Sequence, residues 1–363
     1  MTILIANLLA LFFSAFVVGI LLGVLFFPPM RKAVTGHIAK RTKRKRRSEP
    51  LLSRAPENPI LEPRGSGFEE IATFNAAAVD LDGSVHLLYR AMSKDNTSTI
   101  GYARSENGIT IDERLDEPMY VPRADFEQKN GNPHGNSGCE DPRVSIIGER
   151  LYMTYTAYNG VQPPRGALTS ISLADFCAKR FDKWTQPHLV TPDTITDKDL
   201  GLLPTVIHGN HLLYHRLSNH ICADVLPDLS VEKRVSRCIE IMGPRKGMWD
   251  SARVGIAGPP IPVTGGWLLI YHGVSQRAKY RLGAALLGPQ GVSLLARSAD
   301  PIFEPKESYE RSGKVRNVVF SCGAIVRGDT LFIYYGGGDK VIGVATGSLS
   351  HILGTLRASP LYA

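Results

Sequence analysis

A short stretch, Gly138 to Arg143, carries the residue types in this sequence that are best suited to chemistry. It reads Gly-Cys-Glu-Asp-Pro-Arg and runs directly into an apolar, strand-like segment at 144–147. A carboxylate beside a guanidinium can fix a charge in a pocket. Pro142 restricts its own backbone and biases Asp141 toward an extended conformation. The same residues can also form an acid–base pair that closes a β-turn, so the rest of the chain must decide between a site and a turn.

A repeat in the following chain indicates which elements position this stretch. A turn glycine followed by a short apolar run ending near a tyrosine occurs five times, with the glycines 65, 61, 56 and 63 residues apart. The copies read GSVHLLYRA at 83–91, GERLYMTYTA at 148–157, GNHLLYHR at 209–216, GGWLLIYHG at 265–273 and GDTLFIYYGG at 328–337. Another apolar run precedes each glycine. A period near 60 with several short strands per unit suits a four-stranded propeller blade.

Five copies predict an all-β, five-bladed β-propeller. A doubly wound α/β fold is disfavoured because long helical periodicity is missing between the strands, and a pair of β-sandwiches would not explain the even spacing. In a propeller the first strand of each blade lines a central channel, so polar residues on those strands meet at one mouth. The candidates are Asn75, Asp141, Asp199 and Asp250, and the residues after the repeat tyrosines are Arg90, Thr156, His215, His272 and Tyr335. The alternative is that several of them only tie neighbouring blades together.

The net charge of +8 belongs to one short arm. Residues 31–47 carry nine of the 42 Lys and Arg residues and no acidic residue, and residues 1–30 carry no charged side chain. The chain from 48 onward therefore has 33 basic against 34 acidic residues. We accordingly expect no nucleic-acid binding by the domain.

The N-terminus reads as a single-pass membrane anchor at 2–28. Its uncharged, almost wholly apolar part, residues 2–27, would span about 39 Å as a helix, enough to cross a bilayer core of about 30 Å with tilt. The basic residues follow it, so the positive-inside rule predicts that everything beyond residue 30 lies in the cytoplasm. Residues 29–57 are expected to be a basic juxtamembrane linker, which either binds anionic headgroups or only sets the topology. The propeller is expected at 58–350 and a C-terminal tail at 351–363.

The five cysteines lie at 139, 177, 222, 238 and 322, form no CxxC pair and are odd in number. This pattern predicts neither a disulfide framework nor a zinc site, and it favours a reducing compartment. No other ligand spacing indicates a metal.

With these residues in view, residues 58–345 resemble glycoside hydrolase family 130, which comprises β-mannoside phosphorylases and related β-mannosidases. The matching stretches are FNAAAV at 74–79, LLYRA at 87–91, GCEDPRV at 138–144, DKDLGLLP at 197–204, LLYHR at 212–216, WDSARVG at 249–255, GWLLIYHGV at 266–274, YRLGAALL at 280–287, NVVFSCG at 317–323 and IYYGGGD at 333–339. The family fold is a five-bladed propeller, which agrees with the repeat count.

The resemblance implies roles for the candidate residues. Asp141 would be the general acid, acting through a sugar hydroxyl, while inorganic phosphate attacks in place of activated water. The residues expected to bind substrate are Asn75, Arg90, Glu140, Arg143, Asp250 and Asp339. Those expected to bind phosphate are His215, Arg253, Tyr280 and Lys198, with Arg253 standing where related enzymes often carry lysine. No cofactor or metal is implied, and phosphate is a co-substrate.

We therefore expect an inverting phosphorylase that converts a β-mannoside and phosphate to α-mannose 1-phosphate, reversibly, at a membrane. One alternative is an inverting β-mannosidase that uses water, which needs a second carboxylate across the pocket. Another is a non-catalytic propeller that binds a mannoside or a protein partner. The segment Met92 to Thr99 departs from the family pattern, which leaves the acceptor sugar open.

Overall fold

The computed structural model describes residues 50–358 except 193–194, 231–234 and 236. Contacts divide the chain into two units, 1–48 and 49–363, and only the second is described here. The predicted anchor at 2–28 and the linker up to residue 49 lie outside the described residues. Within the described ranges, no helix is long and apolar enough to cross a membrane.

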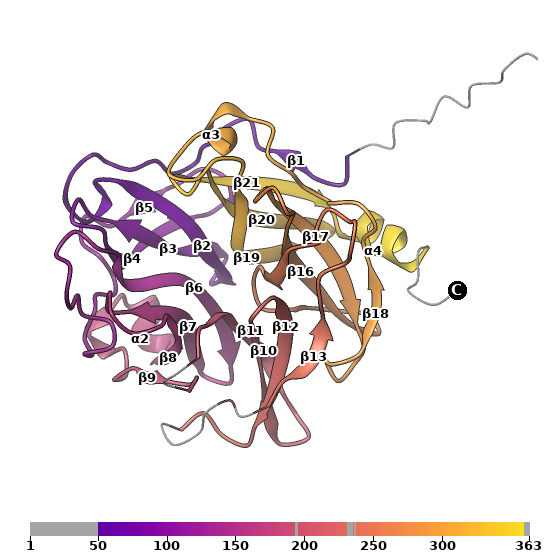
Figure 1. Ribbon diagram of the computed structural model, residues 1–363, viewed down its shortest axis with the longest axis horizontal. Helices are drawn as coiled ribbons and strands as arrows, with labels where there is room; N and C mark the ends of the chain where they lie inside the picture. Colours follow the sequence, from indigo (N-terminus) through magenta and orange to yellow (C-terminus); the bar gives the residue numbers. More distant parts are fainter. Residues whose placement is uncertain (1–49, 193–194, 231–234, 236, 359–363) are drawn as a thin grey trace, which may run out of the picture. The chain divides into compact units, whose positions relative to one another are not determined.

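The described strands of the second unit form five antiparallel blades, which we number one to five, and blades one and two are joined into one sheet by a short parallel pairing at residues 97–98 and 137–138 (Figure 1). Blade one contains β2 (Ala72–Leu81), β3 (Ser84–Met92), β4 (Thr97–Ser105) and β5 (Glu113–Arg114); blade two contains β6 (Ser137–Ile147), β7 (Arg150–Tyr158), β8 (Arg165–Ser172) and β9 (His188–Leu189). Blade three contains β10 (Asp197–Ile207), β11 (Asn210–Leu217), β12 (His220–Leu226) and β13 (Ile239–Met242). Blade four contains β14 (Arg253–Ile256), β15 (Ile261–Val263), β16 (Gly266–Val274), β17 (Tyr280–Leu287) and β18 (Leu294–Arg297); blade five contains β19 (Val319–Arg327), β20 (Thr330–Gly337), β21 (Val341–Ser348) and β1 (Ser53–Arg54).

The predicted all-β propeller is confirmed. Each repeat glycine lies at the turn between the first and second strands of a blade, except that in blade four, where β14 and β15 both pair with β16, it lies between β15 and β16. Short helices occupy the connections: 3-10 helices at Gly67–Glu69 and Phe181–Lys183, and α2 (Leu173–Cys177), α3 (Ser308–Arg311) and α4 (Leu349–Arg357). The core is layered between the blades, because the five largest buried apolar clusters each combine side chains of two adjacent blades. This packing closes the ring in the order one to five.

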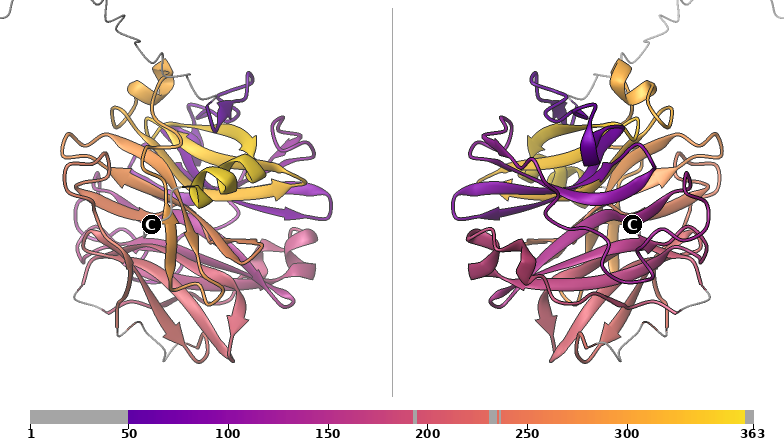
Figure 2. Two further views of the ribbon diagram at one scale, coloured as in Figure 1. Left: turned by 90° about the vertical axis from the view of Figure 1, so that its right-hand side faces the viewer. Right: turned by 90° about the vertical axis from the view of Figure 1, so that its left-hand side faces the viewer.

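Both expected boundaries of the propeller differ from the structure. β1 pairs with β21 through Ser53 and Arg54, so the fourth strand of blade five comes from the start of the described chain, before residue 58 (Figure 1). At the other end, α4 packs Ile352, Leu353 and Leu356 into the cluster shared by blades four and five. Figure 2 shows this yellow helix beside the orange strands of blade four. Residues 53–57 and 349–357 therefore belong to the propeller, because each buries side chains in it or pairs with it.

One hydrogen-bonded pair recurs in every blade, and we call it the aromatic–carboxylate pair. A ring on the second strand bonds to a carboxylate that lies in the segment entering the first strand or begins that strand. The pairs are Tyr89–Glu69, Tyr155–Glu127, His215–Asp197, Tyr271–Asp250 and Tyr335–Glu310. All five carboxylate residues are at most 1% exposed. A buried carboxylate needs such partners, because an uncompensated charge away from water is very costly.

In three blades an arginine of the fourth strand completes this pair. Arg114 bonds to Glu69 at 2.8 Å, Arg297 to Asp250 at 2.6 Å and Arg54 to Glu310 at 2.7 Å. In blade two, Glu127 instead accepts bonds from the backbone N–H groups of residues 123 and 124. The fourth strand, the second strand and the entry segment of a blade are thus tied at one buried point.

The structure contains one disulfide, between Cys222 and Cys238 in blade three. The expectation that the cysteines form no disulfide framework is therefore wrong for this pair. The two cysteines are 16 residues apart in sequence and carry no short motif. Their approach follows from the antiparallel pairing of β12 with β13, which sequence spacing does not reveal. Cys139, Cys177 and Cys322 are free.

Replacing Gly138 by alanine should strongly destabilise the junction between blades one and two. Gly138 has φ +101° and pairs in parallel with Ser98, and an added Cβ would overlap the Ser98 backbone. We expect a loss of at least about 2 kcal/mol in the free energy of unfolding, measured by urea titration. The matched control is Gly148→Ala, where φ is +58° but no atom lies within 4 Å; its loss should stay near about 1 kcal/mol. Equal losses would contradict this account of the junction.

Candidate active site

β-Bulges in the inner strands direct three polar side chains toward the channel. The register shifts between Phe74 and Ala77 in β2, between Glu140 and Arg143 in β6, and between Lys198 and Gly201 in β10. The first bulged residues, Asn75, Asp141 and Asp199, have φ of 54°, 53° and 57°. Asn and Asp tolerate this left-handed conformation better than most residues, and bulges redirect side chains. The extended conformation that Pro142 suggested for Asp141 is therefore wrong, because the bulge determines the backbone conformation of Asp141.

These bulges border a cavity of about 400 Å³ at the channel mouth. Eight of the eleven predicted site residues line it: Asn75, Arg90, Glu140, Asp141, Lys198, Arg253, Tyr280 and Asp339. The other lining residues are Thr196, Asp199, Arg216, His272, Val315, Val318 and Phe320. Repeat topology had pointed to Asp199 and His272, whereas Arg216 and the apolar residues of blade five were missed.

Blades five, one and two contribute a carboxylate-rich wall around Asp141. Asn75 Nδ2 donates to Asp141 Oδ1 at 2.8 Å, and Arg90 Nη1 lies 3.3 Å from the same oxygen. The second Arg90 nitrogen, Nη2, donates to Glu140 Oε1 at 2.9 Å. The Arg90 guanidinium also lies over the Phe74 ring, 4.8 Å from its centroid. Asp141 is thus oriented by an amide and a guanidinium that are themselves fixed by packing.

Blades three and four contribute the opposite, cation-rich wall. Lys198 Nζ lies 3.2 Å from Glu140 Oε2, and Arg216 Nε donates to Asp199 Oδ2 at 2.5 Å. Arg253 Nη2 donates to the Tyr280 hydroxyl at 2.5 Å. His272 lies behind them, with Nε2 3.5 Å from Asp199 Oδ2 and its ring 4.6 Å from that of Phe320.

Arg143 lies beneath the cavity and does not line it. Arg143 is only 1% exposed. Its Nη2 donates to Asp199 Oδ1 at 3.1 Å and to the Ile256 carbonyl at 3.0 Å. It reaches only the backbone oxygen of Asp141, at 3.2 Å. Arg143 therefore joins the inner strands of blades two, three and four, and the structure places it under the site, away from the predicted substrate contacts.

His215 and Asp250 also lie away from the cavity, since both belong to aromatic–carboxylate pairs. Opposite the bulge, His215 takes the position that Tyr89 and Tyr155 take in blades one and two, with its side chain off the channel. The next residue, Arg216, faces Lys198 across the strands, as Arg90 faces Phe74. The feature that places Arg216 in the cavity is therefore its pairing with Lys198 across the strands, and not its position relative to the repeat tyrosine.

Burial and neighbouring charges shift the pKa values of the titratable groups of the site in different directions. Burial raises the pKa of Glu140, but the charges of Arg90 and Lys198 outweigh it, so that this pKa is lowered. Burial also opposes ionisation of Asp199, and Arg216, His272 and Arg143 overcome it and lower its pKa. Burial lowers the pKa of His272 to about 3 despite neighbouring Asp199. At neutral pH these groups are two carboxylates and a neutral imidazole.

Asp339 behaves differently. Burial and the negative charge of Asp141 raise the pKa of Asp339 to about 6. A carboxyl group whose pKa is higher in the folded state stabilises the fold at low pH, and this contribution is lost as pH rises through the folded pKa.

Replacing Asp339 by asparagine should remove this pH dependence. Between pH 4.5 and pH 7, the free energy of unfolding of the wild type should fall by about 2 kcal/mol relative to that of Asp339→Asn, because only the wild type must ionise a buried carboxyl. Urea titrations of both proteins at the two pH values measure the difference. A difference that does not change with pH would contradict the raised pKa of Asp339.

Comparisons with known proteins agree with this geometry. The family model for glycoside hydrolase family 130, described as beta-1,4-mannooligosaccharide phosphorylase, matches residues 42–358. A curated relative, the 1,2-beta-oligomannan phosphorylase of Thermoanaerobacter sp. (strain X514), is 37% identical over 303 residues, which cover 81% of this chain and 96% of that protein.

Two solved structures show the same fold. The beta-1,2-mannobiose phosphorylase of Listeria innocua superposes with a TM-score of 0.70 at 26% identity, covering 85% of this chain and 99% of that one. A second structure comes from a study of family hydrolases that target beta-1,2 mannosidic linkages in Candida mannan; it has a TM-score of 0.69 at 25% identity and covers 81% and 93%. The family match spans most of the chain, and this chain therefore belongs to glycoside hydrolase family 130.

Proposed function

We propose that the protein is an inverting phosphorylase that transfers the mannosyl unit of a β-mannoside to inorganic phosphate and releases α-mannose 1-phosphate. Membership of the family supports the reaction class. The similarity to phosphorylases of β-1,2-linked oligomannan and mannobiose supports β-1,2-linked mannosides as the substrate class.

The segregation of charge in the cavity is the observation that favours phosphate over water. On the side of blades five, one and two, three carboxyl groups (Glu140, Asp141 and Asp339) accompany one guanidinium, Arg90. On the side of blades three and four, the three cations Lys198, Arg216 and Arg253 accompany one carboxylate, Asp199. An excess of cations opposite the general acid suits an attacking phosphate dianion.

The same wall offers a poor general base for water. An inverting glycosidase needs a carboxylate that removes a proton from water on the face opposite the acid. Among the described residues lining the wall of blades three and four, Asp199 is the only carboxylate, and Arg143, Arg216 and His272 surround it. Its lowered pKa makes it a weak proton acceptor. Phosphate arrives as an anion and needs no such base.

In this scheme Lys198, Arg253 and Tyr280 hold phosphate on the far side of the anomeric carbon from the leaving oxygen. A phosphate oxygen forms the new bond to C1 as the glycosidic bond breaks, which inverts the β configuration to α. Asp141 supplies the proton that the leaving oxygen takes up, through a sugar hydroxyl as the family resemblance implies. Asn75 and Arg90 orient Asp141, and Arg216 and His272 fix Asp199 behind the phosphate.

The test is phosphate release from α-mannose 1-phosphate with and without acceptor sugars. We expect release only when a mannose or β-1,2-mannobiose acceptor is present, with a β-mannoside product. Asp141→Asn should lower the rate about 10²- to 10⁴-fold, the usual contribution of an acid catalyst. Arg253→Gln should raise the KM for phosphate in the forward direction about tenfold, because a charged hydrogen bond is lost.

Three outcomes would contradict the proposal. Phosphate release without acceptor would mean that water reaches C1, which favours a β-mannosidase. Forward turnover that is independent of phosphate would mean the same. Mannoside binding without product under any phosphate concentration would favour a non-catalytic binding protein.

We further propose that residues 2–28 anchor the protein in a membrane with the propeller in the cytoplasm. The support is the uncharged N-terminal segment followed by nine basic residues at 31–47. The full chain should remain in membranes after an alkaline carbonate wash, and protease added to vesicles with the cytoplasmic side outward should digest the propeller. Release by the wash, or protection from the protease, would contradict this location.

A further inference from the structure

Blade three departs from the other blades at its aromatic–carboxylate pair. Where blades one, four and five have a glycine on the third strand opposite the ring, it has Cys222 opposite His215. Ala223 of β12 pairs with Ile239 of β13. Continuing this antiparallel pairing by one residue puts Cys238 in the fourth-strand position that Arg114, Arg297 and Arg54 hold in blades one, four and five. A disulfide thus occupies the site where three other blades have a buried ion pair.

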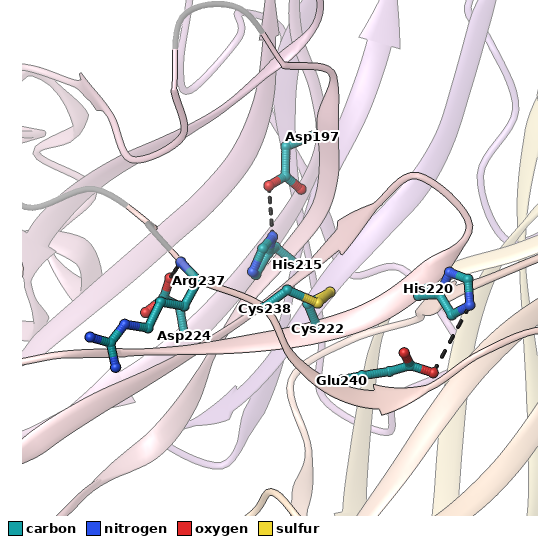
Figure 3. Close-up of a disulfide and its surroundings, with 8 residues drawn as sticks. All are labelled: Asp197, His215, His220, Cys222, Asp224, Arg237, Cys238 and Glu240. Carbon is teal, nitrogen blue, oxygen red and sulfur yellow. Dashed lines mark hydrogen bonds and ion pairs between the residues drawn. A yellow bond between two sulfur atoms is a disulfide. The ribbon is translucent and has the colours of Figure 1, made fainter.

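The disulfide and the pair share one small cavity. Asp197, His215 and Cys238 line a space of about 170 Å³, together with Pro192, Ile195, Leu217, Val235 and Arg237. Figure 3 shows Asp197 and His215 beside the disulfide. His215 Nδ1 lies 2.6 Å from Asp197 Oδ2, and the two side chains are each 2% exposed. Within the described part of the chain, His215 Nε2 and Asp197 Oδ1 have no hydrogen-bond partner. Among the described residues, Asp197 therefore has one polar side-chain partner, His215, and no arginine.

The opposite face of the same two strands forms the cation-rich wall of the active site. Thr196 and Lys198, on either side of Asp197, line the catalytic cavity, as does Arg216, which follows His215. Before the β10 bulge, β10 and β11 are paired only at Asp197–Leu217 and Lys198–Arg216. This short ladder carries two of the three cations of that wall, Lys198 and Arg216, and the His215–Asp197 hydrogen bond ties its two strands together through side chains.

We propose that Cys222–Cys238 is a redox-modification site whose reduction by a small dithiol weakens phosphate binding through the His215–Asp197 pair. Cys238 is exposed and Cys222 is fully buried, so an incoming thiol meets Cys238 first. This inference rests on the proposed phosphorylase function. In the cytoplasmic location proposed above, a disulfide is expected to be transient and responsive.

The reaction is ordinary thiol–disulfide exchange. A thiolate of the dithiol attacks the Cys238 sulfur, the bond between the two protein sulfurs breaks, and the Cys222 sulfur leaves and is protonated. The second thiol of the reagent then attacks the mixed disulfide and releases the Cys238 thiol. The protein gains two electrons and two protons, and the dithiol becomes a cyclic disulfide. Without the crosslink, the segment that holds Cys238 is no longer tied to Cys222, which lies opposite His215, so the His215–Asp197 pair is held less firmly.

The experiment compares the full chain before and after treatment with dithiothreitol. Thiol titration of the denatured protein should find three thiols in the oxidised form and five in the reduced form. Phosphorolysis rates measured against phosphate and against β-1,2-mannobiose then give two separate KM values. We expect reduction to raise the KM for phosphate about three- to tenfold, a typical coupling between linked sites, while the KM for the mannoside changes less than about twofold.

Variants separate the bridge from the other cysteines. The double variant Cys222→Ser/Cys238→Ser should show the reduced-form KM for phosphate with or without dithiothreitol. Cys177→Ser, which removes an exposed free thiol, should keep the full redox response; the treated wild type also tests the proposal if the double variant does not fold.

Four results would overturn the inference: five thiols that resist mild oxidation, an unchanged phosphate KM in the five-thiol form, equal shifts in both KM values, or loss of the response in Cys177→Ser. Failure of the phosphorylase proposal is distinct, because then the oxidised protein already shows no phosphorolysis.

Discussion

The aromatic–carboxylate pair is the interaction on which the rest of this propeller depends. Each blade buries one carboxylate between its second strand and the segment that enters its inner strand. Removing one partner of such a buried group leaves a charge without compensation, which costs about 3–5 kcal/mol. The pair therefore fixes the entry segments, and those of blades three and five contribute Thr196, Val315 and Val318 to the catalytic cavity.

The ring closure determines how charge is distributed at the centre. Adjacent blades share apolar layers, so the side chains at the channel mouth follow the order of the blades. Carboxyl groups of blades five, one and two consequently face cations of blades three and four. The bulges at Asn75, Asp141 and Asp199 bring these groups together on inner strands rather than on loops. Rigid strands hold an acid and an anion site at a constant separation, which favours an in-line displacement.

In blade three, the active site and the aromatic–carboxylate pair lie on the two faces of the same strands. Thr196, just before β10, and Lys198 and Asp199 in β10 line the active site, while Asp197 between them belongs to the pair that supports the blade. The alternation of a β-strand separates the two faces by a single residue. A change on the disulfide side therefore has a short path to the phosphate side.

Local patterns in the sequence determined the fold class and most of the site. The five glycine-to-tyrosine repeats depend only on neighbouring residues, and they were enough to predict five blades and to bring Asn75, Arg90 and Asp141 to one mouth. Tertiary structure decided what depends on distant partners. Asp250 proved to be the blade-four carboxylate because Arg297 and Tyr271 surround it, and Arg143 faces Asp199 rather than the Asp141 side chain. The β10 bulge put Arg216, not His215, in the cavity, and strand pairing joined Cys222 to Cys238. The physical reason is that bulges and cross-strand registers are set by packing between segments far apart in the chain, and periodicity along the chain carries no record of them.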